Sequence, residues 1–286
     1  MVEKYVFSPK RGIVVTPYTA RVTLGLTRGD VPVDFGLRQV EVMRDAGGGV
    51  VFLLEEGDRI VDARLLEKIV ETDRLLFIPD LGEPYLVEIR DKHYYKLRYL
   101  GERTPPTVEI DGIHMHNISG TTPDRDAKRK VDMLAVRRGE KGLDICTGLG
   151  YTATEAYRRG ASIITIEADL NVLRIAEHNP FSRELSRVEI LLGDALQVID
   201  VFPEEGFDFI LHDPPVFAFA PKLYSTEFYV KLARILKKRG RLFHYTGSPG
   251  KHRGLDIQRG VAERLRKAGF VVKRVEKGYG LLAVRV

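Results

Sequence analysis

Short apolar runs alternate with amphipathic segments along the second half of this 286-residue chain. Six runs, from GLDIC at 142–146 to FVVKRVE at 270–276, are each separated from the next by a stretch with helical periodicity. Strands and helices that alternate in this way form a mostly parallel sheet with helices on both faces. The last run, LLAVRV, follows FVVKRVE after only KGYG, which is too short for a parallel crossover. The sequence therefore predicts a doubly wound α/β domain that ends in an antiparallel hairpin.

The first hundred residues follow a different pattern. Short β-type runs, among them ARVTLGL at 20–26, are punctuated by Gly, Pro and Asp. One segment, DARLLEKIVE, has helical periodicity, and Asp62 is its expected N-cap. We predict a small, β-rich α+β domain at residues 1–105 that helps to select the substrate. A polar connector at 106–130 then leads to the second domain at 131–286.

Composition restricts the cellular setting. No run approaches the roughly 18 apolar residues of a membrane span, and the N-terminal segment lacks the apolar core of a signal peptide. The single cysteine, Cys146, excludes an intrachain disulfide framework and a cysteine-cluster zinc site. We expect a cytoplasmic protein without a membrane or metal partner. Only three Asn and three Gln occur, a depletion typical of thermophiles.

The charge of the chain favours anionic partners without requiring them. Its formal net charge is +5 and its isoelectric point is near 9.1, which suits RNA and equally suits an ordinary lysine-rich surface. The loop TGSPGKHRG follows the fifth strand of the predicted sheet. Its Lys251 and Arg253 are expected to hold a phosphate or another anion of the substrate, with a solvated surface as the alternative.

A glycine-rich turn follows the first predicted strand. In the segment DICTGLG at 144–150, glycines let the backbone approach a ligand and present amide N–H groups at the start of a helix. Glu167, seventeen positions after Gly150, suits ribose hydroxyls, and Asp194 suits the amine of an adenine. Either acid alone is more often a helix cap or a solvated charge. Together with Asp144 they predict a nucleotide site, because ligands bind at the carboxyl edge of open α/β sheets.

The order of these motifs resembles the class I S-adenosylmethionine-dependent methyltransferases. Over residues 115–286, D-x-x-x-G-x-G is followed by E, then G-D-A, then D-P-P, each at the end of a strand. More narrowly, the CTGLGYT turn and the HDPP-F motif are similar to an archaeal group of predicted methyltransferases. The resemblance implies a Rossmann-like, seven-stranded sheet and S-adenosylmethionine as cofactor.

The resemblance also implies roles for individual residues. Glu167 contacts the ribose and Asp194 the adenine. A further set lines the methionine side of the cofactor: Asp144, Gly148 and Gly150. Thr147 stands where many members of the family have glycine, so we expect it at the cofactor with the donor carboxylate held differently.

The fourth strand ends at Asp213-Pro214-Pro215. Methyl transfer from a sulfonium is an in-line displacement, so the enzyme mainly aligns nucleophile, methyl carbon and sulfur. The Asp213 carboxylate and the Pro214 carbonyl can each accept a hydrogen bond from an amino group and offset its developing positive charge. In the family, Asp/Asn-Pro-Pro-aromatic marks methylation of amino nitrogens. Here Val216 replaces the aromatic residue, so we expect Pro215 and Phe217 to contact the acceptor; the alternative is a packed loop beside the cofactor.

Histidine and cysteine residues near these motifs have two interpretations. His212 and His244 end adjacent strands and could assist proton removal as bases, with packing as the alternative. The pair His114 and His116 has no further ligand at helical spacing, so no metal is expected. Cys146 lies inside the cofactor turn and is interpreted as a small apolar residue rather than a nucleophile.

Three other functions compete with methyl transfer. A nicotinamide-dependent dehydrogenase would place its third glycine at Ala153, and its chemistry gives Asp-Pro-Pro no role. An aminopropyltransferase similar to spermidine synthase has a related nucleotide site and an N-terminal β-rich domain, but a polycation needs an acidic acceptor site. A non-catalytic binding protein would not need carboxylates at all four strand ends.

We therefore expect an enzyme that moves a methyl group from S-adenosylmethionine to an amino nitrogen, with tRNA or rRNA as the favoured acceptor. A base inside a stem would have to be flipped out of the helix. A small molecule or a protein as acceptor stays open, as do the methylated atom and a homo-oligomeric state.

Overall fold

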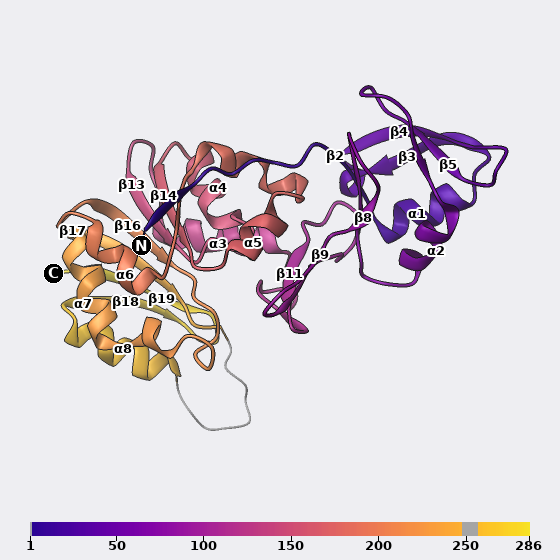
Figure 1. Ribbon diagram of the computed structural model, residues 1–286. Helices are drawn as coiled ribbons and strands as arrows, with labels where there is room; N and C mark the ends of the chain where they lie inside the picture. The colour runs from indigo at the N-terminus through magenta and orange to yellow at the C-terminus, as the bar shows by residue number, and fades with distance from the viewer. Residues whose placement is uncertain (1, 248–256) are drawn as a thin grey trace. The chain divides into compact units, whose positions relative to one another are not determined.

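The computed structural model describes residues 2–247 and 257–286. Its contacts divide the chain into two compact units, shown in Figure 1. The first unit comprises Met1–Phe7, Asp124–Leu170 and Glu184–Val286, and the second comprises Ser8–Pro123 and Asn171–Arg183. The chain thus begins in the unit that also holds its C-terminal half.

An eight-stranded sheet forms the centre of the first unit, in the order β1-β15-β14-β13-β16-β17-β19-β18. The parallel strands are β13 (Lys141–Ile145), β14 (Ser162–Glu167), β15 (Glu189–Leu192), β16 (Phe207–His212) and β17 (Leu236–Tyr245). At one end, β19 (Gly280–Arg285) lies between β17 and β18 (Phe270–Glu276) and is antiparallel to both. This arrangement confirms the doubly wound, Rossmann-like fold and the C-terminal hairpin.

One strand of this sheet was not expected. Residues Glu3–Tyr5 form β1, which pairs antiparallel with β15 and brings Glu3 opposite Leu192. The sheet therefore has eight strands, one more than the seven predicted. Three residues without an apolar alternation give no strand signal of their own, because their pairing depends on a partner far along the chain.

Helices cover the two faces of the sheet. They are α3 (Pro123–Leu134), α4 (Tyr151–Arg158), α6 (Ala195–Val198), α7 (Thr226–Ile235) and α8 (Ile257–Lys267), while α5 (Leu170–Ala176) falls mostly in the second unit. Ser225 caps α7, and the helix ends at Ile235. Leu236 is fully buried and pairs with Phe207 in the parallel ladder. Strand pairing therefore overrides the helical propensity of the LKK segment.

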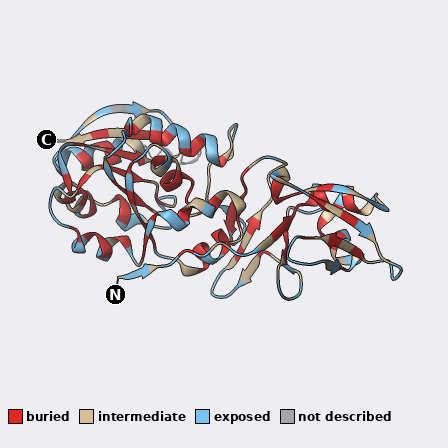
Figure 2. Ribbon diagram, turned by 90° about the horizontal axis from the view of Figure 1, so that it is seen from above, coloured by how far each residue is buried: buried red, intermediate tan, exposed pale blue. Residues whose placement is uncertain are grey.

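Apolar side chains of the central strands pack with those of α6, α7 and α8 in one buried cluster. Figure 2 shows the buried residues along these elements. The cluster includes Leu143, Ile210 and Leu242 from the sheet and Phe228 and Leu232 from α7, all nearly inaccessible to solvent. Strands that are apolar on both faces are typical of a parallel sheet covered on each side.

The second unit contains three small sheets. They run β3-β4-β5-β6, β2-β7-β8 and β12-β11-β10-β9. The strands are β2 (Gly12–Val15), β3 (Arg28–Val33), β4 (Arg38–Arg44), β5 (Val50–Leu53), β6 (Arg59–Val61), β7 (Leu76–Pro79), β8 (Tyr85–Leu86), β9 (Glu88–Arg90), β10 (Tyr94–Arg98), β11 (Thr107–Ile110) and β12 (Ile113–His114). The segment 106–130, predicted as a connector, contains β11, β12 and most of α3.

Helices α1 and α2 belong to the same unit. Asp62 caps α2 (Ala63–Val70) as predicted, with its side chain accepting from the Arg64 amide. The run ARVTLGL was expected as a strand, and that prediction is wrong, because most of it belongs to α1 (Pro17–Leu24). Thr16 caps this helix and Pro17 occupies its first position, two start signals that outweigh the β-branched residues inside it. None of the helices in the described part of the chain is long and apolar enough to cross a membrane.

Candidate active site

Four carboxylates gather at one edge of the large sheet. Asp144 lies in β13, Glu167 ends β14, Asp194 caps α6 after β15, and Asp213 follows β16. Because these strands are parallel neighbours, their carboxyl ends meet at the same edge. The structure thus brings together the acidic residues that the sequence analysis selected.

The glycine-rich turn has a left-handed backbone at both glycines. The φ angle is +55° at Gly148 and +76° at Gly150, which is the N-cap of α4. A Cβ atom at Gly150 would lie 2.3–2.5 Å from three side-chain carbons of Leu185. Conformation and packing therefore both require glycine at this position.

Beneath the turn, Asp144 belongs to a buried hydroxyl network. Its two oxygens accept from Thr152 Oγ1 at 2.8 Å and from Thr165 Oγ1 at 2.6 Å. Thr147 Oγ1 lies 2.7 Å from Thr165 Oγ1 and so donates to it. Burial raises the pKa of Asp144 to about 7 despite these bonds. In this arrangement Asp144 and Thr147 shape the turn from below, and the two further threonines were not selected from the sequence.

Glu167 holds the turn from the neighbouring strand. Its Oε2 accepts from the Gly148 amide at 2.9 Å, and its Oε1 accepts from the amides of Ala168 and Asp169 at 2.9 and 3.1 Å. Burial raises its pKa to about 7. A carboxylate offers about four lone-pair positions, so these contacts leave about one for a ribose hydroxyl. From the sequence, contacts of Glu167 to both ribose hydroxyls are expected.

These residues fit S-adenosylmethionine. The Asp194 side chain is exposed and uses one oxygen, Oδ1, to accept from the Leu196 amide at 2.9 Å, so its other oxygen can meet the adenine amine. Glu167 retains an acceptor for the ribose, and the turn places backbone N–H groups at the start of α4. When bound, the cofactor supplies an electrophilic methyl group on its sulfonium. The protein supplies the alignment of that group with the acceptor.

The Asp213 carboxylate is paired with Lys130, the last of three consecutive basic residues at 128–130. Lys130 Nζ lies 2.6 Å from Asp213 Oδ2 and 2.8 Å from Asp126 Oδ2. Burial lowers the pKa of Lys130, but the carboxylates of Asp213 and Asp126 outweigh it and raise the pKa above its ordinary value. Burial also raises the pKa of Asp213, against the effect of Lys130. The pairing spans 83 positions, so no local pattern could reveal it.

The loop after Asp213 combines a fixed backbone with exposed apolar side chains. The Tyr224 hydroxyl donates to the Pro215 carbonyl at 2.9 Å, and the rings of Tyr224 and Phe217 meet edge to face at 5.4 Å. Phe217 and Phe219 nevertheless remain 41% and 60% exposed. Aromatic surface of this kind beside a site can stack on a planar group.

The two histidines lie under this loop. His212 and His244 are register partners in β16 and β17, with ring centroids 4.4 Å apart and no exposed surface. His212 Nε2 contacts the Leu223 carbonyl at 3.0 Å, and the Tyr229 hydroxyl contacts His244 Nε2 at 2.8 Å. Burial lowers the pKa of His212 to about 4. These contacts favour the packing interpretation over a role for His212 as a base. The predicted substrate residues Lys251 and Arg253 lie outside the described residues.

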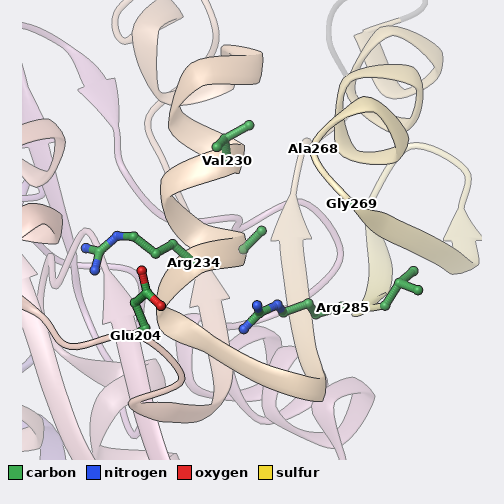
Figure 3. A pocket seen from close by; sticks show the side chains of 8 residues that line it. Glu204, Val230, Arg234, Ala268, Gly269 and Arg285 are labelled. Carbon is green, nitrogen blue, oxygen red and sulfur yellow. The ribbon is translucent and has the colours of Figure 1, made fainter.

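A separate pocket, the hollow shown in Figure 3, lies at the edge of the sheet opposite the four carboxylates. Figure 3 shows Arg234 of α7 and Arg285 of β19 in its lining. Arg234 donates to the carbonyls of Phe202 and Ile199, and Arg285 pairs with Glu205 at 3.2 Å. Since both arginines already bind protein groups, we assign no ligand to this hollow.

Comparisons with known proteins agree with this fold and site. Residues 143–244 match the family model described as "Methyltransferase domain". Residues 143–244 of the chain thus form a methyltransferase domain. It is 51% identical over 235 residues, 80% of each chain, to "Uncharacterized protein MJ1233" of Methanocaldococcus jannaschii, and it belongs to the same family.

More distant similarities cover parts of other proteins. Over 91 residues the chain is 33% identical to "Putative ribosomal RNA large subunit methyltransferase MJ1653" of Methanocaldococcus jannaschii, which covers 30% of this chain and 24% of that protein. The crystal structure of spermidine synthase from Thermotoga maritima superposes with a TM-score of 0.51 at 17% identity, covering 69% of this chain and 71% of that one. At this identity the second similarity shows the fold alone.

Proposed function

We propose that the enzyme methylates an amino nitrogen of RNA. The observation that carries this proposal is the loop at 213–219, where a carboxylate and a proline carbonyl stand beside exposed Phe217 and Phe219 at the cofactor edge of the sheet. Asp213 and Pro214 would orient an exocyclic amine, and the aromatic side chains would stack on the base that carries it. The net charge of +5 suits the phosphate backbone of RNA.

The reaction needs little acid–base chemistry. The nitrogen lone pair forms the N–C bond as the S–C bond breaks, S-adenosylhomocysteine leaves, and the methylated nitrogen then loses a proton to solvent. The lone pair is free only if the amine donates its hydrogens elsewhere, which is the role proposed for the acceptors of Asp213 and Pro214.

Transfer from methyl-labelled S-adenosylmethionine tests the proposal. The purified enzyme is incubated with RNA, protein and small-molecule fractions of cells that lack the gene, with and without nuclease. Label in nuclease-sensitive material is expected. Label confined to protein or small molecules would refute RNA as the acceptor.

Two carboxylate variants, one just after β16 and one near its start, allow a matched comparison of transfer rates. Asp213→Asn should lower the transfer rate by about 10²-fold, the loss typical of one oriented charge-stabilising contact. Asp208→Asn, near the start of the same strand and paired with Lys237, should leave it nearly unchanged. Phe217→Ala should raise the KM for RNA by about 5-fold or more, since stacking contributes about 1–3 kcal/mol per base.

Aminopropyl transfer is the competing function, favoured by the fold shared with spermidine synthase. The same assay with decarboxylated S-adenosylmethionine and spermidine distinguishes the two. An aminopropylated product, without label in RNA, would replace our proposal by that function.

A further inference from the structure

Lys130 occupies a site that has the chemistry of a receptor for a primary ammonium ion. Its Nζ is 2.6 Å from Asp213 Oδ2, 2.8 Å from Asp126 Oδ2 and 4.0 Å from the ring centroid of Tyr245. Two carboxylates and an aromatic face are the groups that bind an alkylammonium cation. The side chains of Lys130 and Asp126 are only 5% and 4% exposed, and that of Asp213 is 21% exposed.

Helix α3 holds this lysine in place. Asp126 and Lys130 are four residues apart and therefore lie on one face of the helix. On the same helix the Arg129 guanidinium lies 3.9 Å from the ring centroid of Tyr279 and pairs with Glu276 at 2.9 Å. The Tyr279 hydroxyl donates to the Asp126 carbonyl at 3.3 Å. Lys130 is thus a fixed component of the site and not a solvated surface lysine.

Its position determines which acceptors Asp213 can serve. An alkylamine arrives protonated at neutral pH and must lose that proton before its nitrogen can attack the methyl group. It therefore needs an open carboxylate that binds the ammonium and accepts the proton, but one oxygen of Asp213 already holds the Lys130 ammonium. A second ammonium at Oδ1 would stand within a few ångströms of the first, where low-dielectric surroundings strengthen the repulsion. An uncharged aromatic amine meets no such repulsion and can donate to Oδ1.

We infer that Lys130 is a specificity-determining residue, which fills an ammonium site formed by Asp126, Asp213 and Tyr245 and so reserves Asp213 for uncharged amines. The ammonium site itself does not depend on the proposed function. The preference for uncharged amines over alkylammonium ions, which we call the sorting of acceptors, does rest on the proposed function, because it concerns the amine that Asp213 would orient.

Amine rescue tests the site without any acceptor. Lys130→Ala should lower the melting temperature of the enzyme by roughly 10 °C, because it removes the cation that lies between the carboxylates of Asp126 and Asp213. n-Propylammonium chloride, which matches the three carbons and the ammonium lost from the side chain, should restore at least half of that loss. n-Propanol and sodium chloride at equal concentration should restore little, and neither wild type nor Lys128→Ala, an exposed position on the same helix, should respond. Equal responses to n-propylammonium and n-propanol would overturn the ammonium site.

If Lys130→Ala does not fold, Lys130→Ala with Asp126→Asn keeps the carboxylate of Asp213 but removes that of Asp126, so less negative charge is left without its cation. This double variant should still melt higher in n-propylammonium chloride than in sodium chloride. The absence of any difference would count against the site.

Transfer assays test the sorting. The ratio of label in spermidine to label in RNA should rise at least 10-fold in Lys130→Ala, while Lys130→Arg should keep the wild-type ratio because it restores the cation. An unchanged ratio with RNA transfer intact would overturn the sorting alone. Transfer to spermidine by the wild-type enzyme would instead overturn the proposed function, and the rescue of the melting temperature would remain a separate result.

Discussion

The contact between Gly150 and Leu185 leads to a quantitative prediction for Gly150→Ala. The left-handed backbone costs an alanine about 1–2 kcal/mol, and the new methyl group would lie 2.3 Å from Leu185 Cδ1. Forcing a methyl group into a packed core costs about 1–3 kcal/mol more. We therefore expect Gly150→Ala to reduce the free energy of unfolding by about 2–5 kcal/mol.

A double-mutant cycle separates the two causes. Leu185→Ala alone should cost about 2–5 kcal/mol through the cavity it leaves. In that background Gly150→Ala loses the steric part and keeps the backbone part, so it should cost only about 1–2 kcal/mol. Guanidinium unfolding of the four proteins measures each step. If Gly150→Ala costs the same in both backgrounds, the contact with Leu185 is not what excludes a side chain, and the reasoning from packing is refuted.

Three further predictions concern the cofactor edge, the histidines and the first strand. Glu167→Gln should raise the Kd for S-adenosylmethionine at least 10-fold in calorimetry, because an amide group cannot accept all three backbone bonds including that of Gly148; a change below 2-fold would contradict this role. Burial lowers the pKa of His212 to about 4 in the folded protein, against an ordinary value of 6.5, so the folded state binds fewer protons than the unfolded state between these values. The free energy of unfolding therefore falls by about 3 kcal/mol as the pH drops from about 6.5 to about 4. Replacing His212 and His244 by Gln should make the melting temperature depend less on pH in this range. A pH dependence as steep as that of the wild type would contradict the prediction. Removing residues 1–7 should lower the melting temperature and increase light scattering, because β15 becomes an exposed edge; unchanged values would show that β1 contributes nothing.

The sequence predicted those parts of the fold and site that follow from local pattern and strand direction. Glu167 and Asp194 could be placed at one edge because each follows a parallel strand, and that rule needs no contact information. The antiparallel pairing of β18 with β19 followed from the length of one loop. Lys130 could not be placed, because it was one of three basic residues in a row and its partner Asp213 is 83 positions away. The helix at 17–24 was missed although Thr16 and its proline signalled a helix start, because β-branched residues dominated the window.

The pairing of β1 with β15 has a consequence for synthesis on the ribosome. Glu3 and Leu192 are opposite each other in the ladder but 192 − 3 = 189 residues apart in the chain. At about 5–20 residues per second, the first strand waits roughly 10–40 s for its partner to be made. During that interval residues 8–123, which account for most of the second unit, are completed. The amino-terminal strand is therefore the first part of the sheet to emerge from the ribosome, yet it can be incorporated only after most of the chain has been translated.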